Sequence, residues 1–190
     1  MTSNFTIKIP KEISVFYNKK ENKIIFLNFN RTIFIKTYLK ISFDKKTNVL
    51  TVTSKSVNKK TRVTKKNVKI FQGTLAAKIK QAILETTAQF YKQLQFVGVG
   101  YRATNVPNFE SDIFYIRLGL SHTLFLKASK KKDFSISAYK MTKLFLLGNS
   151  FSKVQQSAAF IRSMKKPEPY KGKGILYKNE KIQLKQGKKI

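Results

Sequence analysis

The chain has 190 residues, 42% of them hydrophobic, which is enough for one medium domain or two small ones with buried cores. Lys and Arg total 39 against 9 Asp and Glu, a net charge of +30, which excludes an acidic or neutral scaffold and predicts a polyanionic partner. The absence of Cys excludes disulfides, thiolate nucleophiles and Cys-based zinc sites.

Strand patterns dominate the first third of the chain. β-branched and aromatic residues recur at 7–10, 24–29, 33–35 and 49–53. The second and third of these segments flank the turn Asn30-Arg31-Thr32 and predict a hairpin. Residues 55–69 are polar and basic without a helical stripe, so we expect a loop there.

A helix is predicted from Thr74, which can cap it after Gly73, to about Lys92. Its apolar residues share one face at helical spacing: Leu75, Ile79, Ala82, Ile83 and Phe90. The helix should therefore pack on a sheet. Residues 94–101 follow with strand formers and glycines that disfavour helix.

The strand pattern returns in the second half of the chain. After an Asn- and Pro-rich loop at 104–112, segments 114–120 and 124–126 predict a hairpin around His122. Further strands are expected at 135–138 and 143–147. A second helix follows Gly148-Asn149, and one side of it carries Phe151, Val154, Ala158, Ile161 and Met164.

The two halves share an order of features, which indicates an internal repeat. Gly73 and Gly148 each precede a predicted helix, and the pairs Gly98-x-Gly100 and Gly172-x-Gly174 each follow one, at separations of 74 or 75 residues. We therefore predict an α+β fold of two duplicated domains, residues 1–92 and 93–190. Each should be an antiparallel or mixed sheet with one helix packed on a face.

The segment 162–189 is the strongest candidate for a binding site. It carries ten Lys or Arg against two Glu, together with Tyr170 and Tyr177. Pro167 and Pro169 stop the preceding helix, and glycines allow backbone N–H groups to approach phosphate closely. Charge and aromatic rings at a structured corner favour a nucleic-acid interface over a solvated basic turn, the alternative that stays open.

No catalytic site is visible. His122 is the sole histidine and is expected to be a turn residue. The run Gly98-Val99-Gly100 follows a predicted helix and lacks the third glycine of a dinucleotide loop, so a strand bend or a close backbone contact between domains is expected. We predict no enzyme activity, no metal and no cofactor.

The run 167–175, Pro-Glu-Pro-Tyr-Lys-Gly-Lys-Gly-Ile, resembles the signature of the sixth large-subunit ribosomal protein family, bacterial and organellar type. Segments 7–10, 94–103 and 118–122 are also similar to that family, and the resemblance spans nearly the full chain. It implies two duplicated α+β domains and a structural role in translation. It also implies binding to large-subunit rRNA near the sarcin–ricin loop, beside neighbouring ribosomal proteins and translation factors.

The resemblance also implies which residues contact rRNA. Lys165 and Lys166 stand where the family often has Arg, and Lys lacks the bidentate geometry of Arg toward phosphate. With the basic tail included, the predicted rRNA-binding residues are Arg162, Lys165, Lys166, Tyr170, Lys171, Gly172, Lys173, Gly174, Tyr177, Lys185, Lys188 and Lys189.

The strongly basic composition is also compatible with three other function classes. A non-ribosomal basic RNA-binding module is the closest alternative. A cationic membrane-surface protein would need a helix with lysines opposite large apolar residues, whereas both predicted helices pack on sheets. The third class is a regulator or enzyme acting on nucleic acid; a nuclease would need clustered carboxylates for metal ions, and the sequence shows none.

Composition also bears on location. No apolar run reaches the roughly 18 residues that span a bilayer, so no membrane insertion is expected. Lys outnumbers Arg by 34 to 5, and Asn, Ile and Phe are plentiful, which is typical of an AT-rich genome. We expect an organelle-encoded protein of the mitochondrial ribosome, in the matrix, with a plastid or a bacterial cytoplasm as alternatives.

Overall fold

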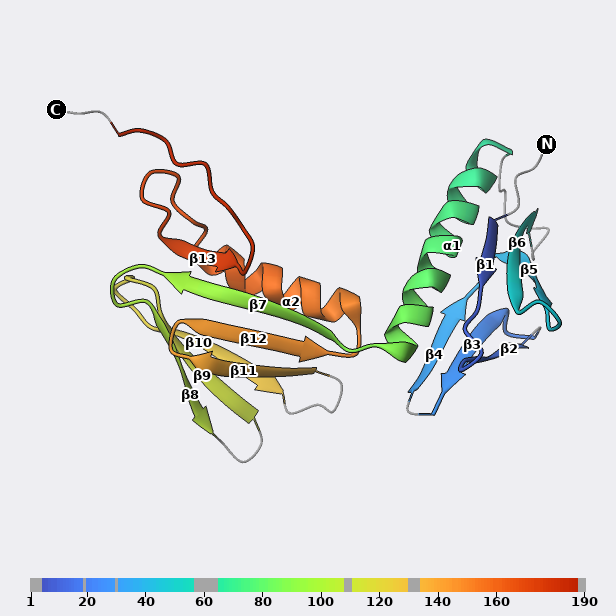
Figure 1. The fold of residues 1–190 in the computed structure, drawn as a ribbon, viewed down its shortest axis with the longest axis horizontal. Helices are drawn as coiled ribbons and strands as arrows, with labels where there is room; N and C mark the ends of the chain where they lie inside the picture. Colours follow the sequence, from blue (N-terminus) through green and yellow to red (C-terminus); the bar gives the residue numbers. More distant parts are fainter. Residues whose placement is uncertain are drawn as a thin grey trace. The chain divides into compact units, whose positions relative to one another are not determined.

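The computed structural model describes residues 5–18, 20–29, 31–56, 65–107, 111–129 and 134–187. The chain divides into an N-terminal unit that ends at Ala88 and a C-terminal unit that begins at Gln89 (Figure 1). Each unit combines antiparallel strands with a helix packed on them, so the predicted α+β class is confirmed. The boundary predicted after residue 92 falls inside a strand of the C-terminal unit.

The strands of the N-terminal unit pair as β1-β6-β5 and β2-β3-β4, antiparallel throughout. In β3, Ile24 and Phe26 are buried in the core while Leu27 is exposed, which is the alternation of a half-buried strand. The hairpin predicted around residues 30–32 is confirmed as β3–β4. The strand bounds are β1 (Phe5–Lys8), β2 (Ser14–Asn18), β3 (Lys23–Asn28), β4 (Arg31–Lys36), β5 (Leu39–Asp44) and β6 (Val49–Ser56).

Helix α1 (Lys65–Thr87) packs on these strands and begins earlier than predicted. Ile79 is fully buried in one core with Phe26 and Val52. The buried stripe also extends upstream of Gly73, because the polar side chain of Gln72 is buried there. A stripe of apolar residues alone misses this first part of the helix.

The predicted helix start at Thr74 is wrong. Its Oγ1 donates a hydrogen bond to the carbonyl of Phe71, at 3.0 Å, which is an interaction of a helix interior and not a cap. Gly73 lies inside the helix, where packing outweighs its propensity cost of about 1 kcal/mol. The loop predicted at 55–69 is also wrong at both ends, since β6 reaches Ser56 and α1 begins at Lys65, while 57–64 lie outside the described residues.

Helix α1 ends at Thr87, before the predicted end near Lys92, because the β3–β4 hairpin caps it. Arg31 Nη1 donates to the carbonyl of Glu85, at 2.9 Å, and to that of Ala88, at 2.8 Å. The last carbonyls of a helix lack intrahelical hydrogen-bond donors. The guanidinium of Arg31, from a distant part of the sequence, supplies donors to two carbonyls at this helix end.

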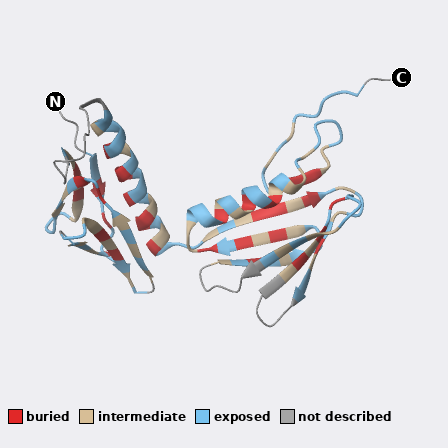
Figure 2. Ribbon diagram, turned by 180° about the vertical axis from the view of Figure 1, so that it is seen from behind, coloured by how far each residue is buried: buried red, intermediate tan, exposed pale blue. Residues whose placement is uncertain are grey.

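The strands of the C-terminal unit pair as β8-β9-β10 and β11-β12-β7-β13. Helix α2 (Phe151–Met164) packs on β7, β12 and β13, and Val154, Ala158 and Ile161 are its buried residues (Figure 2). The predicted second hairpin is confirmed as β9–β10. The strand bounds are β7 (Phe90–Val97), β8 (Arg102–Pro107), β9 (Ser111–Arg117), β10 (Leu124–Ser129), β11 (Phe134–Lys140), β12 (Lys143–Gly148) and β13 (Gly174–Tyr177).

The predicted duplication is confirmed by topology, although not by the glycines that suggested it. Order β1-β6-β5 recurs as β7-β12-β11, and β2-β3-β4 recurs as β8-β9-β10. Gly73 lies within α1, whereas Gly148 ends β12; Gly98 and Gly100 follow β7, whereas Gly174 begins β13. Strand β13 has no counterpart among the described strands of the N-terminal unit.

Among the described strands, the sequence pattern does not predict β2, β5, β8 and β13. The loop predicted at 104–112 is wrong at its ends, where β8 and β9 pair with Val106 opposite Ile113. Arg102, Asn105 and Val106 of β8 are exposed, so this strand lacks the apolar alternation that would reveal it. No helix in the described ranges is long and apolar enough to cross a membrane.

Candidate nucleic-acid interface

The end of α2 leads into a short closed loop, here called the basic loop (residues 165–174). Lys165 leaves the helix with extended backbone, φ −149° and ψ 90°. The N–H of Glu168 donates to the carbonyl of Lys173 at 2.9 Å, and the N–H of Gly172 donates to that of Glu168 at 2.9 Å. The loop is therefore a hydrogen-bonded turn with a defined backbone.

Gly174 closes the stem of the basic loop because no side chain fits there. Its φ is +154°, and a Cβ at this position would lie 2.5 Å from Cα of Pro167. Next to it, the N–H of Ile175 donates to the carbonyl of Lys165 at 3.0 Å. Two backbone segments thus cross at closest approach, which only glycine permits.

The space around Gly172 is less tightly packed than that around Gly174. Its φ of +68° lies in the left-handed region, and a Cβ there would be 3.4 Å from Cδ2 of Leu184, an exposed side chain. The sequence interpretation assigned both glycines to a close approach of phosphate. The contacts inside the chain supply a structural reason for each glycine without a ligand.

The basic tail (residues 178–187) folds back onto the unit. Lys178 N–H donates to the carbonyl of Gln93 at 3.1 Å, directly after β13 pairs with β7. Farther on, Lys185 N–H donates to the carbonyl of Pro169 at 2.9 Å, so the tail is attached to the basic loop. Loop and tail therefore form one surface.

An internal ion pair supports this surface. Arg162 of α2 donates from Nε to Oε2 of Glu180 at 3.0 Å, and its Nη2 pairs with Oε1 of the same carboxylate. The N–H of Tyr177 also donates to Oε2, at 3.1 Å. The hydrogen bonds from Arg162 lower the pKa of Glu180, against the opposing effect of burial, and the pKa of Arg162 is raised mainly by its bond to Glu180.

Tyr177 is enclosed by cations of its own chain. Lys92 Nζ lies 4.7 Å from the centre of its ring, and Cζ of Arg162 lies 5.4 Å from it. Both are within the range of cation–π interactions. Tyr177 and Arg162 thus have partners in the protein, and their role toward rRNA stays a prediction.

The other predicted site residues differ in how far their side chains are exposed to solvent. Lys166, Tyr170, Lys171 and Lys185 are exposed on the loop and tail, Lys165, Gly172 and Lys173 are half-buried, and Gly174 is buried. Lys188 and Lys189 lie outside the described residues. The structure thus brings the basic residues of loop and tail to one end of the C-terminal unit.

Two residues of this site, Glu180 and Lys92, could not be recognised from the sequence pattern. Glu180 accepts hydrogen bonds from the side chain of Arg162 and from the N–H of Tyr177. In the sequence, the feature that could have indicated this role is that Glu180 is one of only two acidic residues in the basic segment 162–189. The sequence predicts Lys92 at a helix end, whereas the structure has it in β7 against Tyr177. His122 lies exposed in the β9–β10 turn, as predicted. Among the residues described, no three His, Asp or Glu side chains gather as metal ligands.

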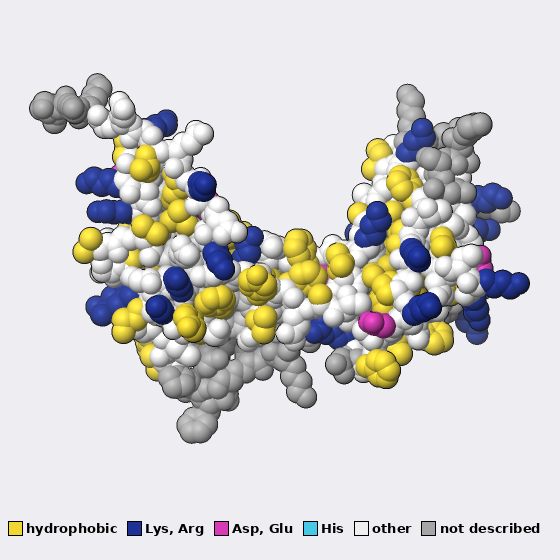
Figure 3. Space-filling model, in the orientation of Figure 1, with side chains coloured by type: hydrophobic (Ala, Val, Ile, Leu, Met, Phe, Trp, Pro, Cys, Tyr) yellow, Lys and Arg dark blue, Asp and Glu magenta, His cyan; other side chains and the backbone are white. Residues whose placement is uncertain are grey.

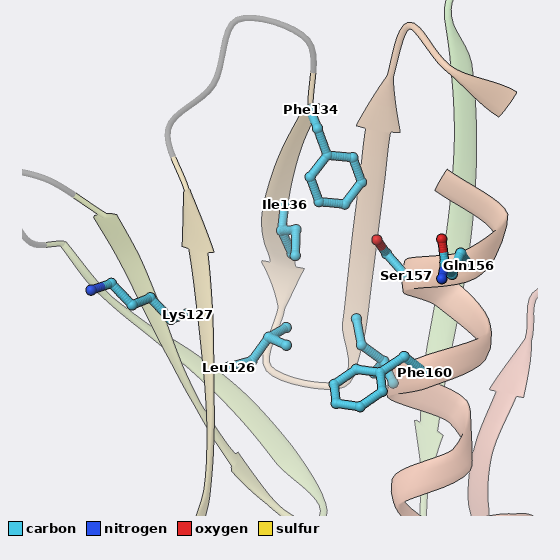
Figure 4. Close-up of a pocket in the computed structure, with 8 residues that line it drawn as sticks. Leu126, Lys127, Phe134, Ile136, Gln156, Ser157 and Phe160 are labelled. Carbon is cyan, nitrogen blue, oxygen red and sulfur yellow. The ribbon is translucent and has the colours of Figure 1, made fainter. Parts of the chain in front are cut away.

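A hollow of about 420 Å³ lies elsewhere in this unit, between α2 and the strands β10 and β11 (Figure 4). Leu126, Ile136, Phe134 and Phe160 line it, while the side chain of Lys127 extends away from them in the view of Figure 4. Its described lining is mainly apolar, with Lys127 as its one cation, so it offers less positive charge to a phosphate than the basic loop and tail do.

Comparison with known proteins agrees with the family resemblance. A family described as Ribosomal protein L6 matches residues 97–178, which include the basic loop and β13. Large ribosomal subunit protein uL6 of Mycoplasma pneumoniae is 39% identical over 150 residues, covering 79% of this chain and 74% of that protein. The uL6 of Rhodopseudomonas palustris is 37% identical over 134 residues, covering 70% and 72%.

Large ribosomal subunit protein uL6m of Marchantia polymorpha is 41% identical over 102 residues. These residues are 54% of this chain and 97% of that protein. The similarity thus extends over bacterial and uL6m proteins. By these similarities the chain belongs to the ribosomal protein uL6 family, which is a family of ribosomal proteins and not of enzymes.

Proposed function

We propose that this protein is a structural component of the large ribosomal subunit and binds large-subunit rRNA through its basic loop and tail. Membership of the uL6 family carries the proposal, since the relatives are named as large-subunit proteins. The placement near the sarcin–ricin loop and the translation-factor-binding region rests on the resemblance of residues 167–175.

The charges of the C-terminal unit support an RNA-binding role for this end. Its carboxylates with described side chains are Glu168 and Glu180, and Glu180 is neutralised by Arg162. Lys166, Lys171 and Lys185 project from a hydrogen-bonded backbone. Cations on an ordered support lose little freedom when they bind phosphates, which favours affinity.

The remaining predicted residues receive different roles in this proposal. Lys165, Lys173 and Tyr170 would contact rRNA directly, together with Lys188 and Lys189 of the chain's end. Arg162 and Tyr177 would act by holding the tail in place, because Glu180 and Lys92 already engage them. Gly172 and Gly174 would set the shape of the loop.

Partners and location follow from the same proposal. In the assembled subunit, neighbouring large-subunit proteins would lie beside this protein and the rRNA that it binds. Translation factors would bind nearby. The similarity to uL6m supports a mitochondrial ribosome in the matrix, with plastid and bacterial ribosomes as the alternatives.

Co-sedimentation with large ribosomal subunits tests this function. A deletion from Pro167 is unsuitable because it removes β13 and the fully buried Ile175 from the core. We therefore compare Lys166→Gln/Lys171→Gln/Lys185→Gln with Lys40→Gln/Lys45→Gln/Lys46→Gln, a triple of exposed lysines in the N-terminal unit that loses the same charge.

The loop-and-tail triple should lose association with subunits, whereas the N-terminal triple should keep most of it. The slope of log affinity for rRNA against log salt should fall by about 1 for each phosphate contact removed. Equal binding by both triples would contradict the proposed interface. Binding of RNA without any association with subunits would favour a non-ribosomal RNA-binding module.

A further inference from the structure

The sheet β11-β12-β7-β13 has one face on the core and α2, and another that turns away from them. Leu94, Leu144 and Leu146 point to the core side. Because side chains alternate along a strand, the residues between them point to the opposite side. We call this opposite side the outer sheet face; its central residues are Tyr91, Gln93, Tyr139, Lys143, Phe145 and Leu147.

The strand register brings these side chains together. Tyr91 lies opposite Leu147, and Gln93 lies opposite Phe145. The rings of Tyr139 and Phe145 meet edge to face with centres 6.0 Å apart. The outer sheet face thus carries a contiguous row of aromatic and aliphatic groups on a rigid support.

Much of this aromatic surface is open to solvent. Tyr139 is 73% exposed, Tyr91 is 66% exposed and Leu147 is 41% exposed. Figure 3 shows hydrophobic side chains between Lys and Arg over the strands β7 and β12 of this unit. A contiguous exposed apolar patch on a folded unit marks a site of interaction.

Charge and chemistry indicate what would cover the patch. Lys143 lies on the same face, opposite Gln95 and beside Lys140. The carboxylates whose side chains are described in this unit, Glu168 and Glu180, both belong to the C-terminal segment. Exposed rings beside ammonium groups, with no described carboxylate on the same face, are the chemistry that binds unpaired RNA, by stacking on base faces and by attraction to phosphates.

The outer sheet face also adjoins the basic tail. Lys178, the first residue of the tail, donates its N–H to the carbonyl of Gln93, one of the central residues of the face. A strand of RNA held by the tail therefore has a continuous path onto Tyr91. Duplex RNA could not stack on Tyr91 in this way, since its base faces are covered by neighbouring bases.

We propose that the outer sheet face is a second RNA-binding surface, on which Tyr91 and Tyr139 stack against unpaired bases. This inference rests on the proposed function for the identity of the RNA, an unpaired segment of rRNA. It is separable from the basic loop, because stacking is independent of salt to first order whereas phosphate contacts are not.

The test measures binding of the full chain to a labelled single-stranded RNA of ten nucleotides and to a duplex of equal length, over a series of salt concentrations. Tyr91→Ala/Tyr139→Ala is compared with Tyr91→Phe/Tyr139→Phe, which keeps the rings. Phe125→Ala is the control, since Phe125 is 62% exposed on β10, in the other sheet of this unit, and contacts Tyr115.

The alanine double variant should bind the single strand roughly tenfold more weakly at every salt concentration, with an unchanged salt slope. Its binding to the duplex should change little, and the phenylalanine variant should bind like the unmodified protein. The inference is overturned if the alanine variant binds the single strand normally, or loses as much affinity for the duplex, or if Phe125→Ala causes the same loss. A melting curve for each variant confirms that the fold is intact.

The two proposals fail in different ways. The triple Lys166→Gln/Lys171→Gln/Lys185→Gln should reduce the salt slope, while the tyrosine variants should not. If the lysine triple variant still associates with large subunits, the proposed loop-and-tail interface is wrong. The proposed stacking surface is tested only by the single-strand binding assay.

Discussion

At Gly174 the backbone of another segment occupies the space that a side chain would need. A Cβ would lie 2.5 Å from Cα of Pro167 and 2.9 Å from the carbonyl oxygen of Lys166, and neither atom can move without the loop. We predict that Gly174→Ala lowers the free energy of unfolding by about 2 kcal/mol or more. Chemical denaturation measures this change.

Two other glycines serve as controls for that prediction. Gly172→Ala should cost less, about 1 kcal/mol, because its φ is left-handed but its neighbour is the movable end of Leu184. Gly73→Ala should stabilise the protein by about 0.5–1 kcal/mol, since Gly73 lies in α1 and a Cβ added to it would meet nothing within 4 Å. A Gly174→Ala variant as stable as Gly172→Ala would contradict the close approach at the loop stem.

The ion pair of Glu180 predicts a dependence of stability on pH. Because the pKa of Glu180 is lowered in the folded state, the carboxylate contributes stability above its unfolded pKa of about 4.3. That contribution is lost as pH falls through the lower folded-state pKa. Glu180→Gln should therefore destabilise the protein at pH 7, by roughly 1–2 kcal/mol, and much less at pH 3.

Thermal melts of the unmodified protein and of Glu180→Gln at both pH values measure the difference. Glu168→Gln is the matched control, because Glu168 is exposed on the basic loop. A loss of stability that is the same at pH 3 and pH 7 would exclude the carboxylate charge as its cause.

At the scale of elements, α1 depends on a side chain from a distant hairpin. Arg31 of β4 donates to the carbonyls of Glu85 and Ala88 at the C-terminus of the helix. Arg31→Ala leaves these carbonyls without that donor and should cost about 1–2 kcal/mol. Lys36→Ala, which removes an exposed cation from the same strand, should change stability by less than about 0.5 kcal/mol.

Hydrogen exchange can locate the effect of Arg31→Ala. The amides of the last turn of α1 should lose protection before those of β6, because the cap acts locally. Equal loss of protection over the whole N-terminal unit would indicate that Arg31 supports the core and not the helix end.

At the scale of the molecule, each unit has its own buried core. One core contains Ile24, Phe26 and Ile79, and the other contains Leu94, Leu144 and Ile161. We therefore predict that residues 89–190 fold alone with a cooperative melt. A fragment that begins at residue 93 should be less stable, since it lacks the first residues of β7.

Circular dichroism of the two fragments tests this division. The high positive charge opposes folding of either fragment through self-repulsion, so the melts should be measured with added salt. A fragment of 89–190 that shows no cooperative transition even at high salt would argue against independent domains.

Features that depend on neighbouring residues could be predicted from the sequence. Two-residue periodicity identified the hairpins β3–β4 and β9–β10. Helical spacing identified Val154, Ala158 and Ile161 as the buried residues of α2, whereas Phe151, predicted on the same side, is exposed. The composition indicated an acidic partner, and the run 167–175 indicated the family.

Features that depend on contacts between distant residues become visible only in the folded chain. The C-terminus of α1 is set by Arg31, more than fifty residues upstream, and the start of β13 by the backbone of Pro167. The pairing of Arg162 with Glu180 joins a helix to the tail across β13. Periodicity carries no information about such contacts, because they arise only when separate segments pack and satisfy one another's polar groups.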